Sequence, residues 1–115
     1  MYREEILDLY RKPVNVGVIE DVKPASGENA SCGDSTEIYV KTVDGEIKDV
    51  KHQSDACAIA TASICILSSK IQGMSVEELR DLDKEWMLDQ LGVEISPMRL
   101  KCALLGLNTV QDAIE

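Results

Sequence analysis

Ser31-Cys32-Gly33-Asp34 places a thiol and a carboxylate two residues apart, with a glycine between them that lets the backbone turn tightly. A soft sulfur ligand and a hard oxygen ligand this close together can bind a metal ion and still leave it replaceable. We therefore expect the rest of the fold to be arranged around this stretch.

Two strands are predicted directly after it. Residues 35–43 alternate between inward and outward positions, which is the period of a half-buried strand. Asp44-Gly45 is a strong signal for a two-residue hairpin turn. Residues 46–54 then return as the partner strand, with Val50 on the inner face.

Upstream of the central stretch, the pattern is weaker. Residues 2–11 have the spacing of an amphipathic helix, which ends before Pro13. Residues 18–23 are predicted to form a short strand that stops at Pro24. Residues 25–30 are small and polar, which indicates a mobile loop.

Downstream, only helices are predicted. The first is apolar nearly all round and is therefore expected to be buried. The predicted helices run from Cys57 to Gly73, over residues 75–80 behind a Ser75–Glu78 capping box, over 83–91 up to Gly92, and over 98–114 behind Ser96-Pro97. The order of one helix, three strands and then helices predicts an α+β fold. We expect a three-stranded antiparallel sheet with helices packed on one face, in a single domain of residues 1–115.

Composition excludes several classes of partner. The chain has 115 residues and a formal net charge of −9, whereas nucleic acids and anionic membrane surfaces attract basic proteins. No apolar run approaches the roughly 18 residues of a membrane span, and residues 1–10 contain no signal-peptide core. We expect a cytoplasmic protein, whose four cysteines are better suited to metal binding or catalysis than to disulfides.

Three of the cysteines lie at the ends of predicted elements. Cys57 lies in the first turn of the buried helix, where backbone N–H groups favour a thiolate. Cys102 lies in the second turn of the last helix, beside the positive charge of Lys101. Together with Cys32 and Asp34, they would complete a tetrahedral metal site.

Each of these residues also has a simpler explanation. A free cysteine is usually a small buried hydrophobic residue, and this fits Cys65 best, because it lies roughly 12 Å along the helix axis from Cys57. Asp34 has two alternatives, a solvated turn residue or a local cap for nearby N–H groups. Lys101 has the alternative of an ordinary surface lysine. His52 is interpreted as a hydrogen-bonded structural histidine rather than a ligand.

Several short motifs stand around the three cysteines and behind the first helix. They are Pro13-Val14-Asn15-Val16-Gly17, Cys32-Gly33-Asp34, Cys57-Ala58-Ile59-Ala60 with Ser63, and Arg99-Leu100-Lys101-Cys102-Ala103-Leu104-Leu105. In order and separation these motifs resemble the U-type iron–sulfur cluster assembly scaffolds (IscU, SufU and the N-terminal domain of NifU). The resemblance covers most of the chain and implies a SufE/NifU-like fold.

The resemblance also implies a function. Cys32, Cys57 and Cys102 would ligate a nascent [2Fe–2S] cluster, with Asp34 as an oxygen ligand or as the neighbour that makes the site labile. A cysteine desulfurase would supply the sulfur, apo iron–sulfur proteins would receive the cluster, and two chains in a homodimer would bridge one cluster in some forms. Such a protein is a carrier without turnover of its own, and zinc can occupy the same pocket.

One position separates the branches of this family. Lys101 stands where IscU has histidine and the SufU branch has lysine, but the chain has no room for the insertion that SufU-type members carry. We expect Lys101 to pair with Asp34 in the metal-free protein or to stabilise thiolates. The alternative functions are a zinc-dependent sulfur acceptor that stimulates a cysteine desulfurase, and a structural zinc domain without sulfur chemistry.

Overall fold

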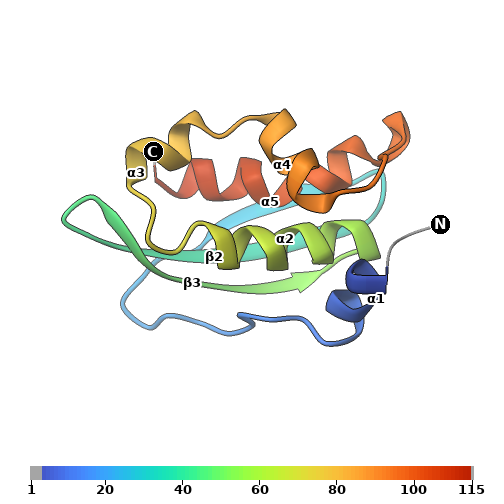
Figure 1. Ribbon diagram of the computed structural model, residues 1–115. Helices are drawn as coiled ribbons and strands as arrows, with labels where there is room; N and C mark the ends of the chain where they lie inside the picture. The colour runs from blue at the N-terminus through green and yellow to red at the C-terminus, as the bar shows by residue number, and fades with distance from the viewer. Residues whose placement is uncertain (1–3, 115) are drawn as a thin grey trace.

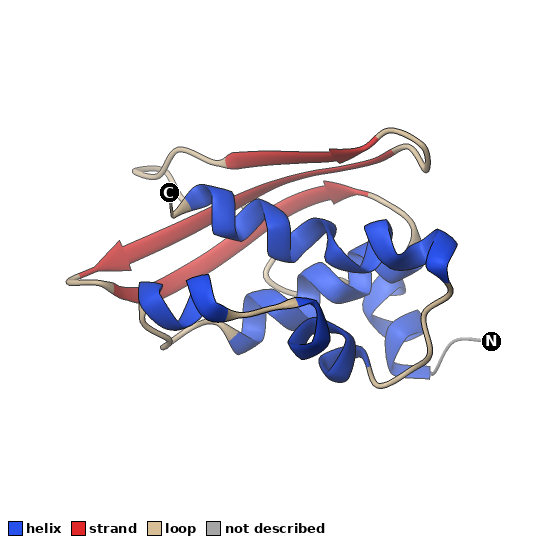
Figure 2. Ribbon diagram, turned by 90° about the horizontal axis from the view of Figure 1, so that it is seen from above, coloured by secondary structure: helices blue, strands red, loops and turns tan. Residues whose placement is uncertain are grey.

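A three-stranded antiparallel sheet forms one layer of the molecule, and helices cover one of its faces (Figures 1 and 2). The structure is a computed structural model that describes residues 4–114. The strands are β1 (Ala25–Asn29), β2 (Asp34–Val43) and β3 (Glu46–Asp55), in the spatial order β1-β2-β3. The helices are α1 (Glu4–Arg11), α2 (Ala58–Lys70), α3 (Val76–Asp81), α4 (Lys84–Leu91), the 3₁₀ turn η1 (Pro97–Arg99) and α5 (Leu100–Ala113). The predicted α+β class is confirmed.

The hairpin between β2 and β3 forms where the sequence predicts it. Val43 pairs with Glu46 across the turn. Asp44 and Gly45 both adopt positive φ angles, of 53° and 78°, which is the geometry that a two-residue hairpin with the right-handed strand twist requires. This hairpin supplies the central strand and one edge of the sheet.

β1 corrects the prediction of a mobile loop over residues 25–30. The strand pairs with β2 in antiparallel register and packs against α5. A Cβ atom on Gly27 would overlap the hydroxyl of Thr109 on α5. The small residues that suggested a loop are therefore needed because a helix approaches the strand closely.

The predicted strand over residues 18–23 is wrong. Val22 N donates to the carbonyl of Ile19 at 3.2 Å, so the chain turns there instead of extending. In the described segment that connects α1 to β1, the only strand-like pairing is a parallel bridge from Val16 to His52. This bridge lies along the edge of β3.

Aliphatic side chains fill most of the space between sheet and helices, and the chain contains no phenylalanine. α2 is the central helix and packs against α1, α4, α5 and β3, which explains its apolar character on nearly all sides. The core includes Ile6, Ile38, Ile47, Val50, Ile59, Ile64, Leu67, Leu79, Leu91 and Val110. Tyr2 and Arg3, which the sequence places in the first helix, lie outside the described residues. Within 4–114, no helix combines the length and the apolar character needed to cross a membrane.

His52 is a hydrogen-bonded structural residue, as the sequence indicates. Its ring is buried, with Nε2 2.8 Å from the carbonyl oxygen of Val14 and Nδ1 3.0 Å from Ser54 Oγ. A carbonyl only accepts, so Nε2 carries the hydrogen and Nδ1 accepts from the serine hydroxyl. Burial lowers the pKa of His52, although the bond to Val14 acts in the opposite direction.

Candidate metal centre

Three segments that are far apart in the sequence meet at one end of the sheet. They are the β1–β2 loop, the start of α2 and the start of α5, at the right of Figure 1. The loop carries Cys32, and Asp34 is the first residue of β2. Cys57 is the N-cap of α2. Cys102 lies in the first turn of α5 and not in its second turn as predicted, because residues 97–99 form a 3₁₀ turn and the α-helix begins at Leu100. The four predicted site residues therefore gather at one end of the molecule.

Cys32, Asp34 and Cys102 form the tightest group. One ligand atom from each lies within 4.8 Å of the others. The Cys102 thiol donates to Cys32 Sγ at 3.4 Å, although the two residues are 70 positions apart in sequence. Bonds of about 2.3 Å from zinc to sulfur place two tetrahedral ligands a little under 4 Å apart, so a single ion fits between these side chains.

Cys57 joins the group through the carboxylate of Asp34. Its Sγ lies 3.8 Å from Asp34 Oδ2, and its backbone N–H donates to Oδ1 at 2.8 Å. Cys57 Sγ is not part of the group within 4.8 Å described above. Asp34, the first residue of β2, therefore holds the start of α2 in place and brings the thiol of Cys57 near those of Cys32 and Cys102.

The sulfur atoms differ in their exposure. Cys32 is exposed, Cys57 is half-buried and Cys102 is buried. Burial raises the pKa of the Cys102 thiol to about 12, and the neighbouring thiols of Cys32 and Cys57 and the carboxylate of Asp34 act in the same direction. In the metal-free protein Cys102 is therefore a thiol, and binding a metal requires the loss of its proton.

Lys101 does not form the expected pair with Asp34. Its side chain is exposed and lines a groove of about 350 Å³ together with Glu28 and Leu104, whereas Asp34 is buried. Successive residues of a helix point about 100° apart. Because Cys102 points into the cluster, its neighbour in the sequence points elsewhere.

Cys65 lies outside the cluster, as the sequence indicates. It is buried in the middle of α2, and its Sγ lies 3.8 Å from His52 Nε2. Burial also raises the pKa of this thiol. Cys65 is thus a small core residue beside the structural histidine.

Asn29 is a contact of the cluster that sequence reasoning missed. Its side-chain amide donates to Cys102 Sγ at 3.5 Å, and its Oδ1 accepts from Ser31 Oγ at 3.0 Å. The residue is buried at the end of β1. Its position two residues before the central stretch was the available signal, but the prediction of a mobile loop removed any reason to give it a role.

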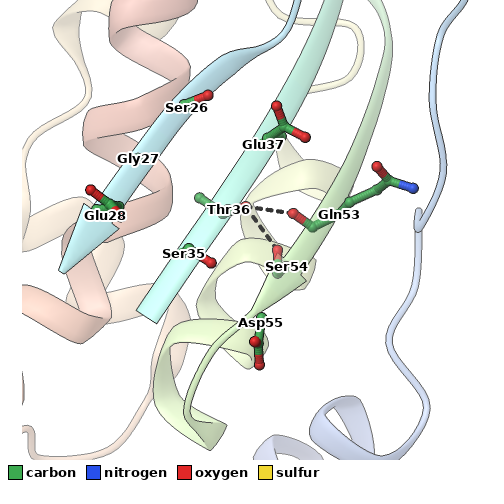
Figure 3. Close-up of a pocket in the computed structure, with 9 residues that line it drawn as sticks. All are labelled: Ser26, Gly27, Glu28, Ser35, Thr36, Glu37, Gln53, Ser54 and Asp55. Carbon is green, nitrogen blue, oxygen red and sulfur yellow. Dashed lines mark hydrogen bonds between the residues drawn. The ribbon is translucent and has the colours of Figure 1, made fainter. Parts of the chain in front are cut away.

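A larger hollow, of about 580 Å³, lies on the strands near the same end of the sheet (Figure 3). Of the described residues that line it, none is a cysteine, a histidine or a cation; its walls are hydroxyls, an amide, carboxylates and Gly27. Thr36 Oγ1 lies 2.8 Å from Ser54 Oγ and 3.4 Å from the carbonyl oxygen of Gln53. This hollow therefore lacks the thiol and imidazole ligands of a metal site. The thiol–carboxylate cluster is the better candidate site.

The fold and the cluster define a small α+β protein with a candidate thiol–carboxylate metal centre at one end of its sheet. The chain belongs to the NifU-like N terminal domain family, whose model matches residues 1–115.

Named relatives of the chain span its whole length. It is 30% identical over 115 residues to the iron–sulfur cluster assembly scaffold protein IscU 1 of Archaeoglobus fulgidus, covering 99% of this chain and 74% of the relative. It is 28% identical over 132 residues to the zinc-dependent sulfurtransferase SufU of Bacillus subtilis, covering 99% and 89%.

Solved structures agree with this assignment. The protein assigned as a SUF-system iron–sulfur cluster assembly scaffold in Fervidobacterium islandicum superposes with a TM-score of 0.84 at 29% identity, covering 99% of this chain and 96% of that one. The resemblance to U-type scaffolds and the SufE/NifU-like fold expected from the motifs are thereby confirmed.

Proposed function

We propose that this protein is a scaffold on which a [2Fe–2S] cluster is assembled from iron and desulfurase-derived sulfur and then transferred to apo-proteins. The observation that carries the proposal is the convergence of Cys32, Asp34, Cys57 and Cys102 at one end of the sheet. Three thiols and one carboxylate supply the soft and hard ligands that iron accepts. Relatives named as cluster assembly scaffolds support it.

The arrangement suits a carrier that must release its cargo. Cys32 lies exposed on a loop, so a sulfur donor or a recipient protein has access to it. Asp34 is the single oxygen ligand in the set, and a carboxylate holds iron less firmly than a thiolate does. In this role the protein binds and hands over a cluster without turnover of its own.

The partners follow from the same proposal. A cysteine desulfurase delivers the sulfur, and apo iron–sulfur proteins accept the finished cluster. A ratio of one cluster to one chain would indicate a monomeric site, and one cluster to two chains would indicate a bridged homodimer. No nucleic acid or membrane takes part, and the cytoplasm is the proposed location.

The second candidate is a zinc-dependent sulfur acceptor that stimulates a cysteine desulfurase. The lysine at position 101 and the relative named as a zinc-dependent sulfurtransferase favour it. In this case Zn²⁺ would occupy Cys32, Asp34, Cys57 and Cys102, and would release one thiolate to take the sulfur.

Anaerobic reconstitution with Fe²⁺, cysteine, a cysteine desulfurase and a dithiol, which reduces the persulfide sulfur to sulfide, separates the two. A scaffold gains visible sulfur-to-iron charge-transfer absorption that is lost in Cys102→Ala and kept in the matched control Cys65→Ala. A zinc-dependent acceptor stays colourless, retains zinc and accelerates desulfurase turnover. Retained colour in Cys102→Ala would contradict the proposed site.

A further inference from the structure

We propose that Asn29 is a positioning residue that donates a hydrogen bond to the sulfur of Cys102 and thereby sets how strongly that sulfur binds its metal. This inference rests on the proposed function, because it concerns a ligand of the same site. It assigns a role to a residue that binds no metal itself.

Asn29 contacts two of the three segments that carry cluster thiols, the β1–β2 loop and the start of α5. Its Nδ2 lies 3.5 Å from Cys102 Sγ on α5, across 73 positions of sequence. Its backbone carbonyl accepts from the N–H of Cys32 at 3.1 Å. Because Asn29 ends β1, the sheet fixes the point from which it reaches the other two elements.

The direction of the hydrogen bond follows from its neighbours. The Cys102 thiol hydrogen points to Cys32 Sγ, so Cys102 Sγ faces Asn29 as an acceptor. On the other side of the amide, Ser31 Oγ donates to Asn29 Oδ1 at 3.0 Å. An amide with its oxygen toward the hydroxyl and its nitrogen toward the sulfur satisfies every partner in this chain of bonds.

Metal binding strengthens this bond. Cys102 must lose its proton to become a ligand, and a hydrogen bond to an anionic sulfur is stronger than one to a neutral thiol. The N–H draws electron density from the thiolate, and such bonds tune the reduction potential and the ligand strength of metal–sulfur sites. Burial of Asn29 protects the bond from competing water.

The test loads the protein with Co²⁺ alone as a spectroscopic probe of the thiolates. It therefore does not depend on cluster assembly. In Co²⁺-loaded protein, Asn29→Ala should move the sulfur-to-cobalt charge-transfer band to lower energy, because the thiolate becomes more electron-rich. Cys65→Ala is the matched control, since it removes a buried side chain that lies outside the cluster and should leave the band in place. A band in Asn29→Ala at the wild-type energy, with full cobalt binding, would overturn the inference.

A second measurement keeps the test independent of the variant's folding. In ¹⁵N-labelled wild-type protein, zinc binding should move a side-chain amide proton of Asn29 downfield and slow its exchange with water. An amide that keeps its metal-free chemical shift and exchange rate would overturn the inference. If no cluster assembles on the wild-type protein but Asn29→Ala still shifts the cobalt band, the scaffold function is rejected and the role of Asn29 is retained.

Discussion

The carboxylate of Asp34 accepts a hydrogen bond from the backbone N–H of Cys57, with 2.8 Å between Oδ1 and N. One candidate ligand thus holds the start of the helix on which another candidate ligand stands. The same carboxylate oxygen pair therefore serves the fold and the site, and the two roles can be separated by substitution.

Asp34→Ala should make a bound cluster longer-lived and slower to transfer, because it removes the ligand that exchanges most readily with other oxygen donors. The decay of visible absorption in the presence of an apo-protein measures this. Unchanged lifetime and transfer would show that Asp34 is not the labile element.

The structural role of Asp34 is tested in the metal-free protein. Asp34→Ala leaves the N–H of Cys57 without its acceptor and should lower the free energy of unfolding by about 1–3 kcal/mol. Asp34→Asn keeps an acceptor oxygen and should lose less. Equal losses in urea unfolding of the two variants would argue against this hydrogen bond as the cause.

Comparison of Cys65 with Cys102 tests which buried thiol belongs to the site. Both are fully buried, so each substitution by alanine removes a similar core side chain at a cost of about 1 kcal/mol. Only Cys102→Ala should reduce zinc binding, measured by competition with a chromophoric chelator. Weakened zinc binding in Cys65→Ala would place this thiol in the site and contradict the assignment.

Acid should destabilise the protein through His52. Its pKa is lowered from 6.5 in the folded state, so below about pH 6.5 the unfolded chain takes up a proton that the folded chain does not. This contribution is present above pH 6.5 and is lost as the pH falls. Between pH 7.5 and pH 5.5, the free energy of unfolding measured in urea should fall more for wild type than for His52→Gln. Equal decreases in the two proteins would contradict the prediction.

Alkali should destabilise the metal-free protein through Cys102. Its pKa is raised from 9.0 to about 12, so the unfolded chain releases a proton above pH 9 that the folded chain retains. The contribution of Cys102 to the free energy of unfolding is therefore fully present below pH 9 and is lost between pH 9 and about 12. Between pH 7.5 and pH 10, the free energy of unfolding of the reduced protein should fall less for Cys102→Ala than for wild type. An equal decrease in the two proteins would argue against a buried, protonated thiol.

The sequence predicts those parts of the fold that depend on local pattern. The alternation of β2 and the Asp44-Gly45 turn specify the hairpin, and the Ser75–Glu78 capping box forms as expected at the start of α3. β1 was missed because Gly27 serves the close approach of α5. A contact between elements so distant in sequence leaves no periodic signal.

The candidate site was predictable by residue but not by geometry. The motifs single out Cys32, Asp34, Cys57 and Cys102, and the structure gathers them, while their role as ligands stays a prediction. The direction of Lys101 depends on the rotational phase of α5, which the sequence alone left open.

X-ray absorption at the zinc edge of the zinc-loaded wild-type protein tests the central claim most directly. If Cys32, Cys57, Cys102 and Asp34 bind one ion, the spectrum will require three sulfur atoms at about 2.3 Å and one oxygen atom at about 2.0 Å, and Asp34→Ala will change the oxygen contribution. A shell of four sulfurs, or one made mainly of nitrogen and oxygen, would contradict the account.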